Sequence, residues 1–136
     1  MAAPDIKAVQ SVLDPIFPGL MGVKLVSVAE DRVVAEMKVR ADLCTTGGIC
    51  HGGAYMAFAD TIAAVGTFMS LPQGARTTTT DSSTKFIAAA KVDTVVTAEA
   101  VALHRGRTTH VWQTSIRRDD GKLCAVVTQT QLLIPG

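Results

Sequence analysis

Apolar and polar residues alternate with a period of two in the first third of the chain. Between residues 33 and 39 every second residue is apolar, and the residues beside them are mostly charged. Successive side chains of a strand point to opposite faces, so this pattern predicts a strand with one face in water. Residues 23–29 are its natural partner, in a hairpin that turns at residues 30–31.

A helical pattern fills residues 51–70, where apolar residues recur every three to four positions and alanine or glycine occupies most others. The segment predicts one long helix that is apolar nearly all round, which is typical of a buried helix. Near the N-terminus, residues 5–13 predict a short helix that begins at Asp5. The prolines that follow it predict its end, with a turn at Gly19.

The second half of the chain returns to strand patterns. Turn residues separate its last three strands, which predicts an antiparallel meander. Together the elements predict a single α+β domain over residues 1–136, in which an antiparallel β-sheet wraps around one long central helix. The predicted strands are residues 77–87, 94–103, 107–117 and 122–134, with turns at His104-Arg105-Gly106 and Asp119-Asp120-Gly121, and residues 41–50 are predicted to form a loop.

Composition narrows the classes of function. The formal net charge is +1 and the basic residues are scattered, which argues against binding to nucleic acid. The apolar stretch 16–21 is too short for a signal peptide or a membrane span, so we expect a cytoplasmic protein that contacts no membrane. Three cysteines without zinc-ligand spacing predict free thiols and no metal site. A charged fraction of only 18% favours a surface partly covered by another subunit.

One stretch carries the candidate chemistry. In residues 47–60, Gly-Gly-Ile-Cys-His-Gly-Gly-Ala-Tyr-Met-Ala-Phe-Ala-Asp, a glycine-rich turn enters the long helix and a lone acid, Asp60, follows. Unpaired N–H groups at a helix start can stabilise an oxyanion, although an ordinary helix N-terminus also explains the glycines. An unpaired buried carboxylate is costly, which favours a functional Asp60 over one that caps a loop or pairs with an arginine.

This stretch resembles the helix motif of PaaI-like (phenylacetate-degradation type) hotdog thioesterases, in which an H-G-G turn is followed after six residues by Asp or Glu. His51-Gly52-Gly53 and Asp60 match that spacing, and the resemblance in layout extends from about Gly19 to Ile134. It implies a hotdog fold and hydrolysis of an acyl-CoA thioester, with CoA as part of the substrate and no separate cofactor. Asp60 would be the base or nucleophile and the Gly52 N–H the oxyanion donor, while His51 would position the turn or the substrate.

Helix geometry predicts how such a site is built. Nine residues separate His51 from Asp60, a rise of roughly 13 Å, so one protomer cannot bring both to one carbonyl. A two-fold dimer with antiparallel helices would set Asp60 of one chain against Gly52 of the other, and the resemblance implies the same shared site. We therefore expect a homodimer as the minimum unit and a homotetramer as the assembly.

Five residues are expected to contact the substrate: Gly53, Thr45, Tyr55, Arg105 and Arg107. The two arginines could clasp the phosphates of CoA, and a solvated turn explains them equally well. The chain departs from the family pattern at Thr45, where several members have Asn, and at Ala88, where some have Ser or Thr. The acyl group, whether aryl, short-chain or medium-chain, therefore stays open.

Two other functions fit the same fold. A non-catalytic module would bind acyl-CoA and keep Asp60 for folding reasons. A hotdog hydratase or dehydratase would need a histidine and an acid that converge on the substrate, and His51 is too far along the helix from Asp60 within one chain. The hydratase hypothesis is therefore the weaker of the two.

Overall fold

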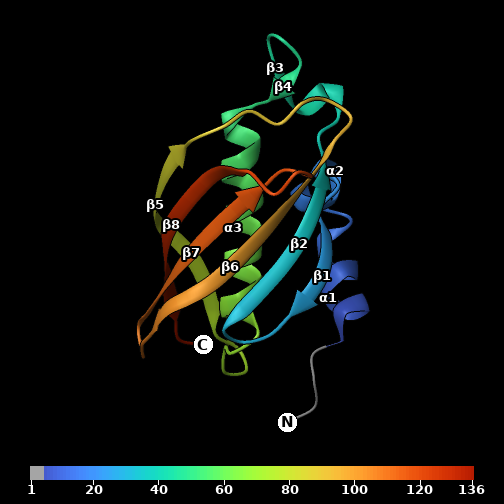
Figure 1. The fold of residues 1–136 in the computed structure, drawn as a ribbon. Coiled ribbons are helices and arrows are strands. Elements are labelled where there is room, and N and C mark those ends of the chain that lie inside the picture. The colour runs from blue at the N-terminus through green and yellow to red at the C-terminus, as the bar shows by residue number, and fades with distance from the viewer. Residues whose placement is uncertain (1–4) are drawn as a thin grey trace.

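The computed structural model describes residues 5–136. Its main strands are β1 (Lys24–Val28), β2 (Arg32–Lys38), β5 (Arg76–Phe86), β6 (Val95–Arg105), β7 (Thr109–Arg117) and β8 (Leu123–Ile134), and its long helix is α3 (Gly52–Phe68). The strands form one antiparallel sheet in the order β1-β2-β6-β7-β8-β5, which curves around α3 (Figure 1). This architecture confirms the predicted fold class, including the meander of the last three strands.

Two short helices precede the sheet, α1 (Ile6–Leu13) and α2 (Phe17–Met21). The first matches the predicted helix. The second occupies the place of the predicted turn at Gly19, so that prediction is wrong. Pro18 is tolerated here because the first turn of a helix needs no N–H partner, and Gly22 ends the helix with a left-handed φ of 82°.

The predicted loop at residues 41–50 contains regular structure. It holds the 3-10 helix η1 (Ala41–Leu43) and a small hairpin of β3 (Cys44–Thr45) and β4 (Ile49–Cys50). Gly47 and Gly48 form its turn, with φ angles of 86° and 69° that glycine adopts without strain. The Cys50 N–H donates to the Ala90 carbonyl at 2.8 Å, so the hairpin is anchored directly before α3 begins.

Helix α3 is not buried all round, which corrects the sequence prediction. Its sheet-facing side is fully covered, and at Gly66 an added Cβ would lie 2.3 Å from the ring of the buried Trp112. The opposite side stays open, with Met56 37% and Phe68 56% exposed and Asp60 half-buried. Alanine and glycine suit either environment, so their abundance did not distinguish the two sides. No helix within residues 5–136 has both the length and the apolar character needed to cross a membrane.

A register shift decides which side chains of β5 face α3. In β5 the register with β8 shifts between Thr79 and Asp81, so Thr80 is an extra residue and the inward-facing set changes from odd to even positions. In the same row across the sheet, β6 continues to Arg105, which pairs with His110, and His110 pairs with Gln131, the partner of Thr79. The predicted turn at residues 104–106 is therefore wrong in its first two residues, because the strand pairing extends further than the glycine suggested.

Candidate active site

The N-terminus of α3 is built around His51. The His51 side chain caps the helix, because its Nδ1 accepts a hydrogen bond of 2.7 Å from the Gly53 N–H. Nδ1 is therefore unprotonated, and the ring lies on the surface. Among the described residues no hydrogen bond engages the Gly52 N–H. The cap thus uses one of the two glycine donors and leaves the donor that the sequence predicted for an oxyanion.

Asp60 lies in the middle of α3 and is held by the sheet. Its Oδ1 accepts from Thr79 Oγ1 at 2.5 Å and from Gln129 Nε2 at 3.0 Å. Within residues 5–136 no hydrogen bond or ion pair engages Oδ2, and no arginine pairs with this carboxylate. Asp60 is therefore a half-buried acid with Oδ1 held by two donors and Oδ2 without a partner in the described part of the chain.

Sequence reasoning missed Thr79 and Gln129. A signal was present, because the inner face of a strand is normally apolar, whereas residues 77–80 and 128–131 are all polar. Two polar strand segments beside one helical acid indicate a shared hydrogen-bond network. The pairing of Thr79 with Gln131 on the neighbouring strand gives this network its geometry.

A continuous helix separates the two catalytic candidates. Gly52 and Asp60 both lie in α3, and their separation of eight residues corresponds to a rise of about 12 Å. A carbonyl group that accepts a hydrogen bond from the Gly52 N–H is therefore out of reach of Asp60 in the same protomer.

Two clefts flank the N-terminus of α3. The first, of about 380 Å³, lies between α2 and α3 and is mainly apolar, with His51 and Gly53 in its wall. The second, of about 350 Å³, brings together Gly52 and three further residues that the sequence singled out: Thr45, Tyr55 and Ala88. Both positions that depart from the family pattern therefore face the same cleft.

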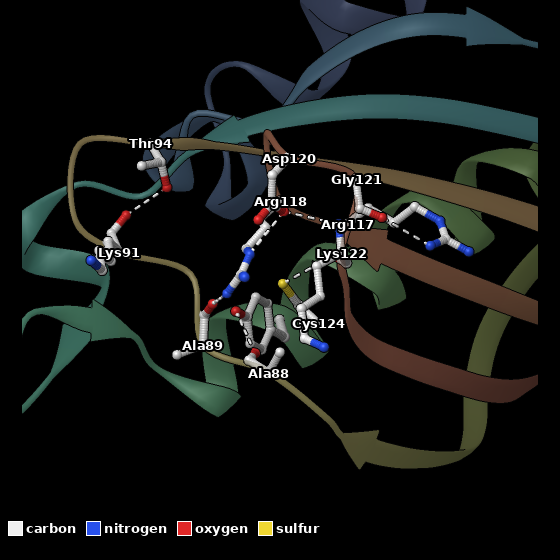
Figure 2. Close-up of polar contacts among 11 residues, drawn as sticks. Ala88, Ala89, Lys91, Thr94, Arg117, Arg118, Asp120, Gly121, Lys122 and Cys124 are labelled. Carbon is white, nitrogen blue, oxygen red and sulfur yellow. Dashed lines mark hydrogen bonds and ion pairs between the residues drawn. The ribbon is translucent and has the colours of Figure 1, made fainter.

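Residues 87–89, which follow β5, form one wall of the second cleft, and hydrogen bonds to their carbonyl groups hold this segment in place. Tyr55 donates from its hydroxyl to the Ala88 carbonyl at 3.4 Å, and burial raises the pKa of Tyr55, so this hydroxyl stays protonated. Figure 2 shows Arg118 between Asp120 and the next carbonyl, that of Ala89. Its Nη1 donates to Ala89 at 2.9 Å and its Nε to Asp120 Oδ1 at 2.9 Å. These two contacts fix the backbone of Ala89, which lines the second cleft.

The predicted phosphate-binding arginines lie elsewhere in the protomer. Arg105 ends β6 and Arg107 follows in the hairpin, at the end of the sheet away from the N-terminus of α3 (Figure 1). Arg105 Nη2 forms an ion pair of 3.0 Å with Glu30 Oε2. Within one protomer, the structure does not bring these arginines to the clefts beside α3.

An antiparallel sheet curved around one helix that carries a central acid defines a hotdog-type enzyme. Residues 47–125, more than half of the chain, match the family model described as "Thioesterase superfamily". The chain therefore belongs to the thioesterase superfamily, which confirms the predicted enzyme class.

Individual relatives share the fold, and those at 26% identity are named as thioesterases or as a CoA hydrolase. The thioesterase HI1161 of Haemophilus influenzae superposes with a TM-score of 0.91 at 26% identity, over 98% of this chain and 92% of that one. The PaaI protein of the Escherichia coli phenylacetic acid degradation operon gives 0.85 at 24% identity, over 96% and 92%. A hypothetical thioesterase of Streptococcus pneumoniae, whose crystal structure contains coenzyme A, gives 0.75 at 26%, over 82% and 87%. The 1,4-dihydroxy-2-naphthoyl-CoA hydrolase of Listeria monocytogenes is 26% identical over 106 residues, which cover 78% of this chain and 85% of that protein.

Proposed function

We propose that the protein hydrolyses an acyl-CoA thioester at a site shared by two copies of the chain. The observation that carries this proposal is the Asp60 carboxylate, which is fixed through Oδ1 by Thr79 and Gln129, while no hydrogen bond within residues 5–136 engages Oδ2. A carboxylate held in this way on the open side of a helix is suited to act on a bound ligand. The related protein that binds coenzyme A and the related CoA hydrolase support CoA as the thiol.

The chemistry follows from the two candidate groups. Asp60 either takes a proton from water, so that hydroxide adds to the thioester carbonyl carbon, or adds to that carbon itself. In both routes the carbonyl oxygen gains negative charge, which the Gly52 N–H and the positive end of α3 stabilise. The C–S bond then breaks, and the CoA thiolate leaves and takes up a proton. In the second route water hydrolyses the acyl-Asp60 anhydride to give the free acid.

The shared site follows from the distance between these groups. Eight residues of helix separate Gly52 from Asp60, whereas both must contact one carbonyl group. A two-fold pair with antiparallel α3 helices sets Gly52 of one chain against Asp60 of the other. The open side of α3 and the edge strand β5 supply apolar surface and unpaired backbone for such a contact. We propose a homodimer as the minimum unit, with a homotetramer as a further level of assembly.

Substrate contacts divide between the clefts. The apolar cleft beside Gly53 suits an acyl chain, and the cleft lined by Thr45 and Tyr55 adjoins the Gly52 N–H. Arg105 and Arg107 can reach the CoA phosphates only from a second protomer. Their role in binding CoA therefore depends on the same dimer.

The experiment is thiol release from a panel of aryl, short-chain and medium-chain acyl-CoAs. We expect turnover by the wild-type protein and a fall in kcat of about 1,000-fold or more in Asp60→Asn, because the amide can neither take a proton nor add to a carbonyl. Asp31→Asn removes the same charge from an exposed turn and should keep wild-type kcat. Retained binding of CoA esters without wild-type turnover would refute the hydrolase in favour of an acyl-CoA binding module.

A further inference from the structure

A chain of hydrogen bonds crosses the sheet and ends at Asp60. Thr77 Oγ1 donates to Gln131 Oε1 at 3.0 Å, and Gln131 Nε2 donates to Thr79 Oγ1 at 2.5 Å. Thr79 Oγ1 in turn lies 2.5 Å from Asp60 Oδ1, where Gln129 Nε2 adds a second donor at 3.0 Å. Four side chains from two strands thus form one network around a single carboxylate oxygen.

The direction of these bonds is fixed by chemistry. An amide N–H can only donate, so Thr79 Oγ1 accepts from Gln131, and its single proton is directed to Asp60. Both bonds to Asp60 fall on Oδ1. The network therefore makes the two carboxylate oxygens unequal, with Oδ1 occupied and Oδ2 available.

Burial indicates that this network has a use beyond folding. Gln129 and Gln131 are both fully buried, although glutamine is usually exposed. In the described part of the chain Gln129 Oε1 has no donor at all, which costs stability. An apolar residue would fill the same position at lower cost. The Gln129 side chain is thus explained by its bond to Asp60.

The extra residue in β5 changes which side chain follows Thr79 on the face toward α3. Thr79 faces α3, and strict alternation would turn Asp81 to the same face, beside Asp60. Because Thr80 is inserted, Ser82 takes that face instead. The bulge therefore keeps a second negative charge away from the carboxylate that the network holds.

We infer that Thr79, Gln129 and Gln131 are positioning residues that fix Asp60 through Oδ1 and direct Oδ2 toward the substrate. Thr79 and Gln129 act on the carboxylate directly, and Gln131 acts through Thr79. The inference rests on the proposed function, because it assigns these residues to the same reaction. It predicts that their loss lowers kcat and leaves substrate affinity intact, because they act through Asp60 and line neither of the two clefts beside α3.

The test compares hydroxyl removal at two buried threonines. Thr79→Val should lower kcat about 10- to 100-fold with KM unchanged within about twofold, and Thr79→Ser, which keeps the hydroxyl, should restore kcat to within about threefold of wild type. Thr114→Val is the matched control, because Thr114 is fully buried on β7 and its hydroxyl has no partner in residues 5–136. It should keep wild-type kcat and KM.

A double mutant tests whether Gln131 acts on Asp60 through Thr79, as the series of hydrogen bonds indicates. Gln131→Met alone should lower kcat about 3- to 10-fold, and in the Thr79→Val background it should have no further effect, because its path to Asp60 is already broken. If Thr79→Val does not fold, Gln129→Met supplies the same test, since it removes the other donor together with the unpaired acceptor. Its kcat should fall while its melting temperature stays close to wild type.

The outcomes separate this inference from the proposed function. Wild-type kcat in a folded Thr79→Val or Gln129→Met protein, beside an inactive Asp60→Asn, overturns the positioning role alone. Equal losses in Thr79→Val and Thr114→Val, or no recovery in Thr79→Ser, overturn it as well. An inactive wild type, or full activity in Asp60→Asn, overturns the proposed function and this inference with it.

Discussion

We predict that hydrogen bonds to the Thr67 hydroxyl stabilise the packing of the C-terminal end of α3 against the sheet. Thr67 Oγ1 accepts from Trp112 Nε1 at 2.8 Å and lies 3.1 Å from His110 Nδ1, and all three side chains are buried. Thr67→Val keeps the shape and the helix propensity of the side chain but removes both hydrogen bonds. Each buried group left without a partner costs about 1–3 kcal/mol. We expect a loss of about 2–4 kcal/mol in the free energy of unfolding.

Urea denaturation followed by Trp112 fluorescence measures this loss. With a slope of about 2 kcal/mol/M, the middle of the range for a small protein in urea, the midpoint should fall by about 1–2 M at fixed protein concentration. Thr61→Val is the control, because Thr61 is half-buried on the same helix and, among the described residues, its hydroxyl bonds only to the Ala57 carbonyl one turn before it. A Thr67→Val midpoint equal to that of wild type would show that the hydroxyl network contributes nothing and would refute the reasoning.

Two further predictions concern the same end of the core. Gly66→Ala should lower the free energy of unfolding by about 1–3 kcal/mol or more, because the added Cβ would lie 2.3 Å from Trp112 Cη2; an unchanged urea midpoint would contradict the close packing. His110 should make stability depend on pH, since burial, assisted by the nearby charges of Arg105 and His104, lowers the pKa of His110 in the folded state. The unfolded chain then binds more protons, so stability should fall as pH drops below about 6.5 toward the folded-state pKa. Urea midpoints at pH 7.5 and 5.5 should differ less in His110→Gln than in wild type, and an equal difference in both proteins would exclude His110 as the cause.

Local patterns in the sequence were sufficient for the elements and for part of the site. Period-two and helical spacings act through neighbouring residues, so they predicted every main strand, α1 and the long helix. The glycine turn before Asp60 is also local. Its cap follows from the first residues of the helix, as does the Gly52 N–H, which has no partner in the part of the chain that the structure describes. The errors at Gly19 and at residues 104–105 arose where tertiary contacts decide at which residue a helix or strand begins or ends.

Only the tertiary structure decided what surrounds Asp60. Its partners Thr79 and Gln129 lie 19 and 69 residues away in sequence, and strand register brings them to the helix. One inserted residue in β5 reverses which side chains face α3, and no periodic pattern predicts such an insertion. The open side of α3 was hidden for a similar reason, because its alanines look alike whether they meet the sheet or remain uncovered. Sequence thus indicated the candidate residues Gly52 and Asp60, and the register of the sheet determined how the Asp60 carboxylate is held.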